Sequence, residues 1–377
     1  MRLFDRTLAA HAWPTCALVL MGFAAACGST GETASSGIAA GGNGGNGGVL
    51  TGVGVGGEGG ASSASSSSSS SSGEGGSGGG EPKLGPPYPI VLSHGFFGFE
   101  DFAGVGFVTY FYEVKDHLAS QGELDVFTPA VDPFNTSDFR GAQLVDYIEQ
   151  ILAITGHEKV NIIGHSQGGL DARVAANLRP DLVASVVTVA TPHGGSRVAD
   201  IALELVSDPD AQDVVSDLLE VIGAPLYDEF GEQTNVWKPL ELFSQPGIAA
   251  FNKAHPDEPG VFYASIAGRS DLHLGGDICD ADVSLPFIAE WQGKLDTVDP
   301  LLSLFESILD GGFGDPYPND GLVRVADSKH GEFWGCLPVD HLDEIGQLFG
   351  DSAGIGNGWK HKVFYADVVA ELRKRGF

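Results

Sequence analysis

The sequence predicts an α/β fold in which a mostly parallel central sheet carries helices on both faces. Four short apolar runs are rich in Val and Ile and lack polar alternation, as strands covered on both faces do: residues 88–93, 160–164, 183–190 and 261–267. Helical patterns lie between and after these runs. Because alternating strands and helices are typical of parallel sheets, the two observations together indicate this fold class.

Two helical segments have apolar residues at helical spacing. The first, residues 141–155, is followed by Gly156, which suits a C-cap. The second lies near the C-terminus and ends in basic residues, which favour the negative end of the helix dipole. The apolar residues are Leu144, Val145, Ile148, Ile151 and Leu152 in the first segment, and Val363, Phe364, Val368, Val369 and Leu372 in the second.

The chain of 377 residues divides into three parts, of which residues 1–27 have the features of an export signal. Arg2 and Arg6 precede an apolar stretch, residues 16–26, that is too short to span a bilayer comfortably. Small residues then precede Cys27, which resembles a bacterial lipoprotein signal whose cysteine is acylated and becomes the new N-terminus. The alternative is an ordinary secretory signal cut nearby, with Cys27 incidental.

Residues 28–81 are nearly all Gly, Ser, Ala and Asn, which predicts a disordered tether. Residues 82–377 have the size of one large domain with its own core. The formal net charge of −30 argues against nucleic acid and anionic membrane surfaces as electrostatic partners. Signal and tether together predict an exported protein. It is expected to be either a cell-envelope lipoprotein, with the outer membrane as its expected location, or a secreted protein.

Two cysteines remain outside the signal and its Cys27, namely Cys279 and Cys336. An even pair in an oxidising compartment predicts a disulfide between them. Two free buried thiols are the alternative.

A serine framed by glycines follows the apolar run 160–164. The stretch Gly164-His165-Ser166-Gln167-Gly168 fits G-x-S-x-G, and a helix is predicted from about residue 169 to 178. This strand–turn–helix context is that of a nucleophile elbow, a sharp turn that exposes the serine hydroxyl. Side chains at the two glycines would collide with the neighbouring strand and helix, and the helix N-terminus favours negative charge beside the serine. The alternative is a Gly-rich turn with an incidental serine.

A serine nucleophile needs a base, and suitable residues follow downstream. Asp320 lies in a turn beside a short apolar run, and His341 follows it. The order Ser, Asp, His fits a triad in which Asp320 orients the imidazole and His341 moves the proton. Spacing leaves other partners open: His330 and His361 as the base, and Asp299 and Asp315 as the acid.

Two backbone N–H groups are candidates for an oxyanion hole. One is the N–H of Gln167, directly after the nucleophile, and the other is the N–H of Phe96, in the loop after the run 88–93. The alternative for His94-Gly95 before Phe96 is a plain turn.

Taken jointly, these residues resemble the true bacterial lipases of the Pseudomonas and Burkholderia type, over about residues 89–370. The resemblance implies an α/β-hydrolase fold that hydrolyses long-chain acylglycerols at a lipid–water interface. It assigns Ser166 as nucleophile, Asp320 as acid, His341 as base, and Phe96 and Gln167 as oxyanion donors. Many relatives need a lipase-specific foldase, so such a partner is an open possibility. The matching pieces are YPIVLSHGFFG, RGAQLVDYIEQILAITG, KVNIIGHSQGGLDAR, PDLVASVVTVATPHGGS, NDGLV and DHLDEIGQLFG.

The resemblance also implies a structural calcium ion (Ca2+) near the base. Its ligands would be the carboxylates of Asp299 and Asp343 and the backbone carbonyls of Gln347 and Asp351. Calcium takes such oxygens and would fix the loop that presents His341. The alternative is that Asp299 and Asp343 only cap or solvate loops.

Three positions depart from the family pattern. Phe96 stands where the family usually has Leu, and Gly194 replaces the arginine of TPHRGS. The family's second disulfide cysteine falls at Ala326, so a bridge between Cys279 and Cys336 must join different loops.

A long insertion relative to a minimal hydrolase covers residues 196–255. The family suggests a mobile helical lid that exposes its apolar face at a lipid surface. A core-facing helix is the alternative. The apolar stripe that prompts both interpretations consists of Val214, Val215, Leu218, Leu219 and Ile222.

The leading hypothesis is a secreted or lipid-anchored triacylglycerol lipase that acts through an acyl-enzyme. The second is a carboxylesterase or polyester hydrolase with the same triad. The third is a non-catalytic surface lipoprotein.

Overall fold

The computed structural model describes residues 83–96, 110–206, 237–270, 277–291, 293–294, 296–299, 302–309, 317–347, 353 and 357–377. All of them belong to one compact unit, Ser77–Phe377. The expected signal with Cys27, the tether 28–81, the apolar stripe of the insertion and Asp351 lie outside the described residues.

Six parallel strands form the central sheet in the order β2-β1-β3-β4-β5-β6. The four strands expected from the sequence are all present as β1, β3, β4 and β5, and the structure adds β2 and β6. The α/β fold class is therefore confirmed. The strands are β1 (Ile90–Ser93), β2 (Val126–Phe127), β3 (Val160–His165), β4 (Val183–Val189), β5 (Phe262–Gly268) and β6 (Glu332–Leu337).

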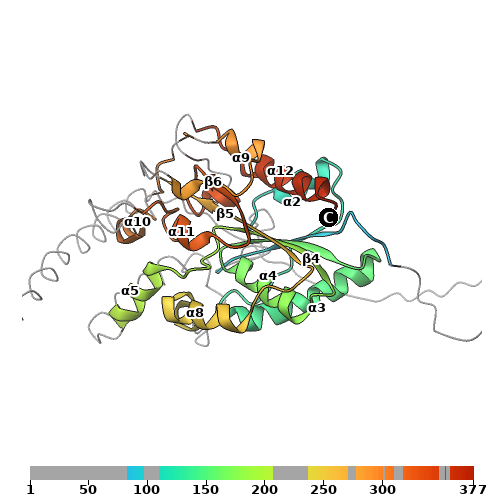
Figure 1. Ribbon diagram of the computed structural model, residues 1–377, viewed down its shortest axis with the longest axis horizontal. Coiled ribbons are helices and arrows are strands. Elements are labelled where there is room, and N and C mark those ends of the chain that lie inside the picture. The colour runs from blue at the N-terminus through green and yellow to red at the C-terminus, as the bar shows by residue number, and fades with distance from the viewer. Residues whose placement is uncertain are drawn as a thin grey trace, which may run out of the picture. The chain divides into compact units, whose positions relative to one another are not determined.

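Helices cover both faces of the sheet, with α3, α4 and α8 on one side and α2, α9 and α12 on the other (Figure 1). The helix expected over 141–155 begins earlier, at Ser137, and ends at Gly156, whose φ of 76° is the left-handed conformation of a C-cap. The helices are α2 (Val114–Ser120), α3 (Ser137–Thr155), α4 (Gln167–Leu178), α5 (Arg197–Val206), α7 (Trp237–Phe243), α8 (Gln245–Ala254), α9 (Pro286–Ala289), α10 (Ser303–Leu309), α11 (Val325–Ser328), α12 (His361–Lys374) and the short 3₁₀ turns η2 (Asp277–Cys279) and η3 (Asp343–Ile345).

The inner strands are buried along nearly their whole length because successive side chains enter two different cores. In β1, Ile90 and Leu92 pack with α2 and α12, whereas Val91 packs with α3 and α4. All three side chains are at most 1% exposed. A strand with polar alternation could not lie between these two helical layers.

Part of the insertion 196–255 packs into the core. Ile248 and Phe251 of α8 lie against Leu170 and Val174 of α4, and both α8 side chains are buried. α8 is therefore a core-facing helix, whereas the apolar stripe on which the lid and core-facing interpretations rest lies outside the described residues. Within the described part of the chain, no helix has the length and apolar character needed to cross a membrane.

Candidate active site

Ser166 occupies a strained turn between β3 and α4. Its φ of 54° and ψ of −129° are rare for a residue with a side chain, and the serine is only half-buried. The flanking glycines make this turn possible. A Cβ at Gly164 would lie 2.5 Å from the Gly168 carbonyl oxygen, and a Cβ at Gly168 would lie 2.1 Å from the Ser93 carbonyl oxygen. The elbow geometry expected from G-x-S-x-G is thus present.

Asp320 and His341 meet although 21 residues separate them. The Nδ1 of His341 lies 2.8 Å from Asp320 Oδ2, and Asp320 is fully buried. The other oxygen of Asp320 accepts backbone N–H bonds from Leu322 at 2.8 Å and Val323 at 2.6 Å. Because Asp320 acts as an acceptor throughout, Nδ1 carries the proton and Nε2 of His341 keeps a lone pair for proton transfer.

The His341 ring lies beside the elbow. Its centroid is 4.6 Å from the ring centroid of His165, the residue directly before Ser166. The competing histidines are engaged elsewhere, since His330 bonds Asp257 and His361 bonds the Tyr112 carbonyl. Of the three candidate bases, His341 is the one that the structure pairs with Asp320. The competing acid Asp315 lies outside the described residues.

The turn that carries Phe96 passes directly over the nucleophile. A Cβ at Gly95 would lie 2.7 Å from the Cβ of Ser166 and 2.4 Å from the Tyr110 hydroxyl. Gly95 therefore allows an approach that no other residue could make. Gln167, the second candidate donor, is fully buried and begins α4, where helical N–H groups have no partner within the helix.

A buried arginine that the sequence analysis missed anchors the same turn. Nη2 of Arg140 donates to the carbonyl oxygens of His94 at 2.6 Å and Gly95 at 3.2 Å, while Nε donates to Asp171 at 2.7 Å. Both charged side chains are fully buried. Because C=O and N–H point in opposite directions across a trans peptide, this anchor turns the Phe96 N–H away from Arg140.

A second buried group lies behind the triad. Nε2 of His165 lies 2.8 Å from Glu344 Oε2, and Nδ1 lies 2.7 Å from the Tyr110 hydroxyl. Burial, followed by the nearby His341, lowers the pKa of His165 well below its usual value. Burial, followed by Asp320 and other acids, raises the pKa of Glu344 well above its usual value. We therefore read this contact as a neutral hydrogen bond, not an ion pair.

Three buried carboxylates converge, and two of them, Asp340 and Asp343, lie next to His341 in the sequence. Ligand atoms of Asp296, Asp340 and Asp343 all lie within 4.8 Å of one another. Burial, together with Asp299 and Asp296, raises the pKa of Asp340 to about 7. Such a group of oxygens suits a divalent cation that prefers oxygen ligands.

The expected calcium ligands fit this group only in part. Asp343 belongs to it together with Asp296 and Asp340, and the backbone N–H of Asp299 donates to Asp340 at 2.8 Å. Asp296 and Asp299 lie only three residues apart in the sequence, so motif matching could not separate them. Gln347 follows η3, and its side chain donates to the Tyr110 carbonyl at 2.9 Å.

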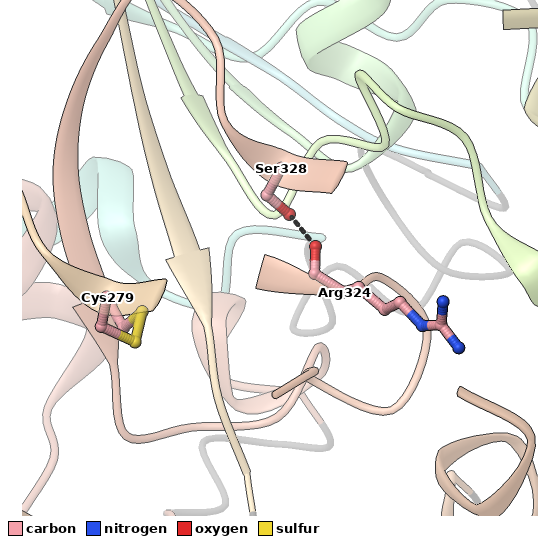
Figure 2. Close-up of a disulfide and its surroundings, with 4 residues drawn as sticks. Cys279, Arg324 and Ser328 are labelled. Carbon is pink, nitrogen blue, oxygen red and sulfur yellow. Dashed lines mark hydrogen bonds between the residues drawn. A yellow bond between two sulfur atoms is a disulfide. The ribbon is translucent and has the colours of Figure 1, made fainter. Parts of the chain in front are cut away.

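The predicted disulfide is confirmed. Cys279 and Cys336 are joined with an S–S distance of 2.02 Å, so the bridge ties η2 to β6. Figure 2 shows Cys279 near α11, whose Ser328 hydroxyl donates to the Arg324 carbonyl at 3.3 Å. Val325 of α11 packs in one cluster with both cysteines. The bridge therefore supports the segment that follows Asp320.

Comparison with known proteins places this chain among ester hydrolases. Residues 88–226 match a family described as alpha/beta hydrolase fold. A triacylglycerol lipase of Vibrio cholerae is 33% identical, with coverage of 76% of this chain and 86% of the relative. A triacylglycerol lipase of Pseudomonas fragi is 32% identical, with coverage of 76% and 95%. One from Burkholderia plantarii is also 32% identical, with coverage of 70% and 80%.

Solved structures agree at the level of the fold. EstA from Clostridium botulinum superposes with a TM-score of 0.52 at 19% identity, over 76% of this chain and 87% of that protein. A metagenomic carboxyl esterase superposes with a TM-score of 0.51 at 19% identity, over 80% and 81%.

Proposed function

The chain belongs to the true bacterial lipase family of the α/β-hydrolase fold and is an ester hydrolase, and from this we propose that it hydrolyses acylglycerols through Ser166, His341 and Asp320. The observation that carries the proposal is the hydrogen bond between His341 and the buried Asp320 beside the strained Ser166 turn. The strained Ser166 backbone and the burial of Asp320 each cost folding free energy, and with His341 they supply the parts of a nucleophilic hydrolase.

In the proposed reaction, Ser166 Oγ attacks the ester carbonyl carbon while His341 Nε2 takes the hydroxyl proton. The Asp320 carboxylate stabilises the imidazolium that forms. The N–H groups of Phe96 and Gln167 donate to the oxyanion of the tetrahedral intermediate. The intermediate collapses to an acyl-enzyme as His341 returns the proton to the leaving alcohol. Water then attacks the acyl carbon, His341 takes its proton, and the carboxylic acid leaves with Ser166 restored.

Acylglycerols are favoured as substrates because the relatives that cover most of this chain are named triacylglycerol lipases. The carboxylesterase and polyester hydrolase alternatives use the same triad and differ only in substrate. Action at a lipid–water interface, lipidation at Cys27, export to the outer membrane or medium, and help from a foldase remain parts of the proposal. They are supported by the sequence and the family resemblance.

Calcium fits the group Asp296, Asp340 and Asp343 on chemical grounds. These residues offer buried carboxylate oxygens that all lie within 4.8 Å of one another. A bound calcium ion would neutralise their mutual repulsion and support the loop around His341, and it takes no part in the proton transfers proposed above. The carbonyl oxygens of Gln347 and Asp351 remain proposed as further ligands.

The function can be tested with a substrate panel and an active-site label. We expect the purified protein to hydrolyse tributyrin and long-chain triacylglycerol emulsions and to react with a fluorophosphonate probe. Ser166→Ala and His341→Ala should lower turnover by a factor of about 10³ or more, whereas Ser120→Ala, at an exposed serine of α2, should leave it unchanged. Faster turnover of polyester film or soluble esters than of emulsions would favour the alternative substrates. Labelling that survives in Ser166→Ala would refute the assignment.

A further inference from the structure

A pocket that is separate from the proposed triad lies between α4, α8 and the segment that leads into β6. Its volume is about 420 Å³, which suits a small molecule. Its lining includes Arg173, His193, Lys329 and His330, and it contains no residue of the proposed triad. The reaction proposed above uses none of these side chains.

Arg173 brings a buried positive charge to this pocket. The residue is 4% exposed. Its guanidinium donates to Asn252 Oδ1 at 2.7 Å and to the His255 carbonyl at 3.0 Å, both neutral acceptors. Nε is buried and has no acceptor among the described residues. The pocket carboxylate, Asp257, bonds His330 at 2.8 Å instead. A buried guanidinium with an unused N–H and only neutral acceptors favours an anion nearby.

The other side chains of the pocket also disfavour a cation. His193 accepts from Arg173 through Nδ1 at 3.3 Å and faces Thr188 Oγ1 through Nε2 at 3.0 Å, so neither nitrogen is free for a metal. The ring of His330 stacks on that of His193 at 4.4 Å. Lys329 adds a second cation, whose Nζ lies 4.4 Å from the centre of the Phe333 ring. The pocket therefore holds two cations against one carboxylate.

We propose that this pocket binds a small oxyanion, either a phosphate group or a carboxylate. The planar guanidinium of Arg173 matches the paired oxygens of both groups, and Lys329 supplies a point charge beside it. Carboxylates are the products of ester hydrolysis and phosphate is a common free anion, so the two sources share one recognition chemistry.

Hydrogen bonds link the pocket to the segment behind the nucleophile. Asn252 Nδ2 donates to the His193 carbonyl at 2.8 Å, and Thr191, two residues earlier, donates to the Ser166 carbonyl at 2.8 Å. An anion held by Arg173 therefore stabilises α4, α8 and the loop after β4 together. Because such a ligand binds the folded state, it raises the melting temperature as its concentration rises.

The test is thermal unfolding of the full chain at pH 7.5, titrated with sodium phosphate or sodium butyrate against sodium chloride at equal ionic strength. We expect a saturable rise in melting temperature with at least one oxyanion and not with chloride. A rise in melting temperature with phosphate alone, or with butyrate alone, identifies which of the two anions the pocket binds. Lys329→Gln should raise the half-saturating concentration about tenfold or more, since a charged contact is lost. Lys294→Gln, which removes the same charge at an exposed site, should leave the half-saturating concentration unchanged.

Two results would overturn the proposal: a response to chloride equal to that of both oxyanions, or the same half-saturating concentration in Lys329→Gln as in the unaltered protein. Neither result bears on ester hydrolysis, because the measurement needs no turnover. Arg173→Lys provides a second variant that keeps the charge and removes the planar fork. It should also weaken binding, with the folded state verified by circular dichroism.

Discussion

At the scale of single residues, Arg140 and Asp171 form a fully buried ion pair beneath the turn that carries Phe96. Burial raises the pKa of Asp171 to about 6, even though Arg140 opposes the shift. Charges in such a place cost desolvation energy, and their value lies in holding the two carbonyl groups of the turn. We regard Arg140 as a positioning residue for the Phe96 N–H.

Replacing Arg140 by Met should lower the free energy of unfolding by about 3–5 kcal/mol, because Asp171 would be left as an uncompensated buried charge. Urea denaturation measures this loss. The matched control is Arg179→Met, which breaks ion pairs of Arg179 with Glu149 and Asp181 at the surface. That change should cost at most about 1 kcal/mol. Equal losses in both variants would show that Arg140 has no special structural role.

His94 should make stability depend on pH. Burial, then the charge of Arg140, lowers its pKa from 6.5 to about 3, and its Nε2 accepts the Val131 N–H at 3.1 Å. As pH falls below 6.5, the His94 imidazole becomes protonated in the unfolded chain before it becomes protonated in the folded protein. The stability from the neutral ring is therefore complete above pH 6.5 and lost as pH falls toward 3.

Relative to His94→Gln, the wild-type protein should lose about 1.4 kcal/mol of stability per pH unit between roughly pH 6 and pH 4. Urea denaturation at several pH values measures the difference, with His117→Gln of α2 as the control for losing an imidazole. A constant difference between wild type and His94→Gln across this range would contradict the buried neutral ring.

At the scale of elements, the sequence reveals those strands whose whole length is apolar. β1, β3, β4 and β5 are buried on both faces and were predicted. β2 has two residues, too few for a pattern, and β6 contains Glu332 and a glycine, Gly335, at φ 121°. Both were missed because their strand character depends on pairing with β1 and β5 and not on their own composition.

The same distinction holds within the candidate site. Ser166 and His341 lie in local motifs and could be predicted, and Asp320 follows from their order. Arg140 and Glu344 could not be found, because long-range packing brings them to the site. Asp296 was not singled out because only the fold brings its carboxylate close to those of Asp340 and Asp343.

The calcium proposal gives a prediction for η3 and the loop that includes Asp296. Chelation by EDTA should lower the melting temperature, since three buried carboxylates then repel one another. Asp296→Asn should abolish this chelator effect, whereas Asp299→Asn should retain it. Differential scanning fluorimetry with and without added calcium makes the measurement. A chelator effect that disappears in Asp299→Asn but persists in Asp296→Asn would restore the ligand set expected from the sequence.

At the scale of the whole molecule, the sheet brings together groups from distant parts of the chain. Ser166 follows β3, Asp320 and His341 flank β6, and the Phe96 turn follows β1. In a parallel sheet the carboxyl ends of the strands lie at one edge, and that edge gathers these groups. The disulfide between Cys279 and Cys336 encloses Asp320 in a covalent loop, and the proposed export to an oxidising compartment would favour its formation.

The central claim is that Ser166, His341 and the N–H groups of Phe96 and Gln167 converge on one reacting carbon. A crystal structure of the protein inactivated by an alkyl fluorophosphonate tests this most directly. We expect phosphorus bonded to Ser166 Oγ, with the phosphonyl oxygen accepting from both N–H groups at about 2.7–3.1 Å. We also expect His341 Nε2 within hydrogen-bond reach of an oxygen on phosphorus. Phosphorus on another residue, or a phosphonyl oxygen that contacts neither N–H group, would contradict the central claim.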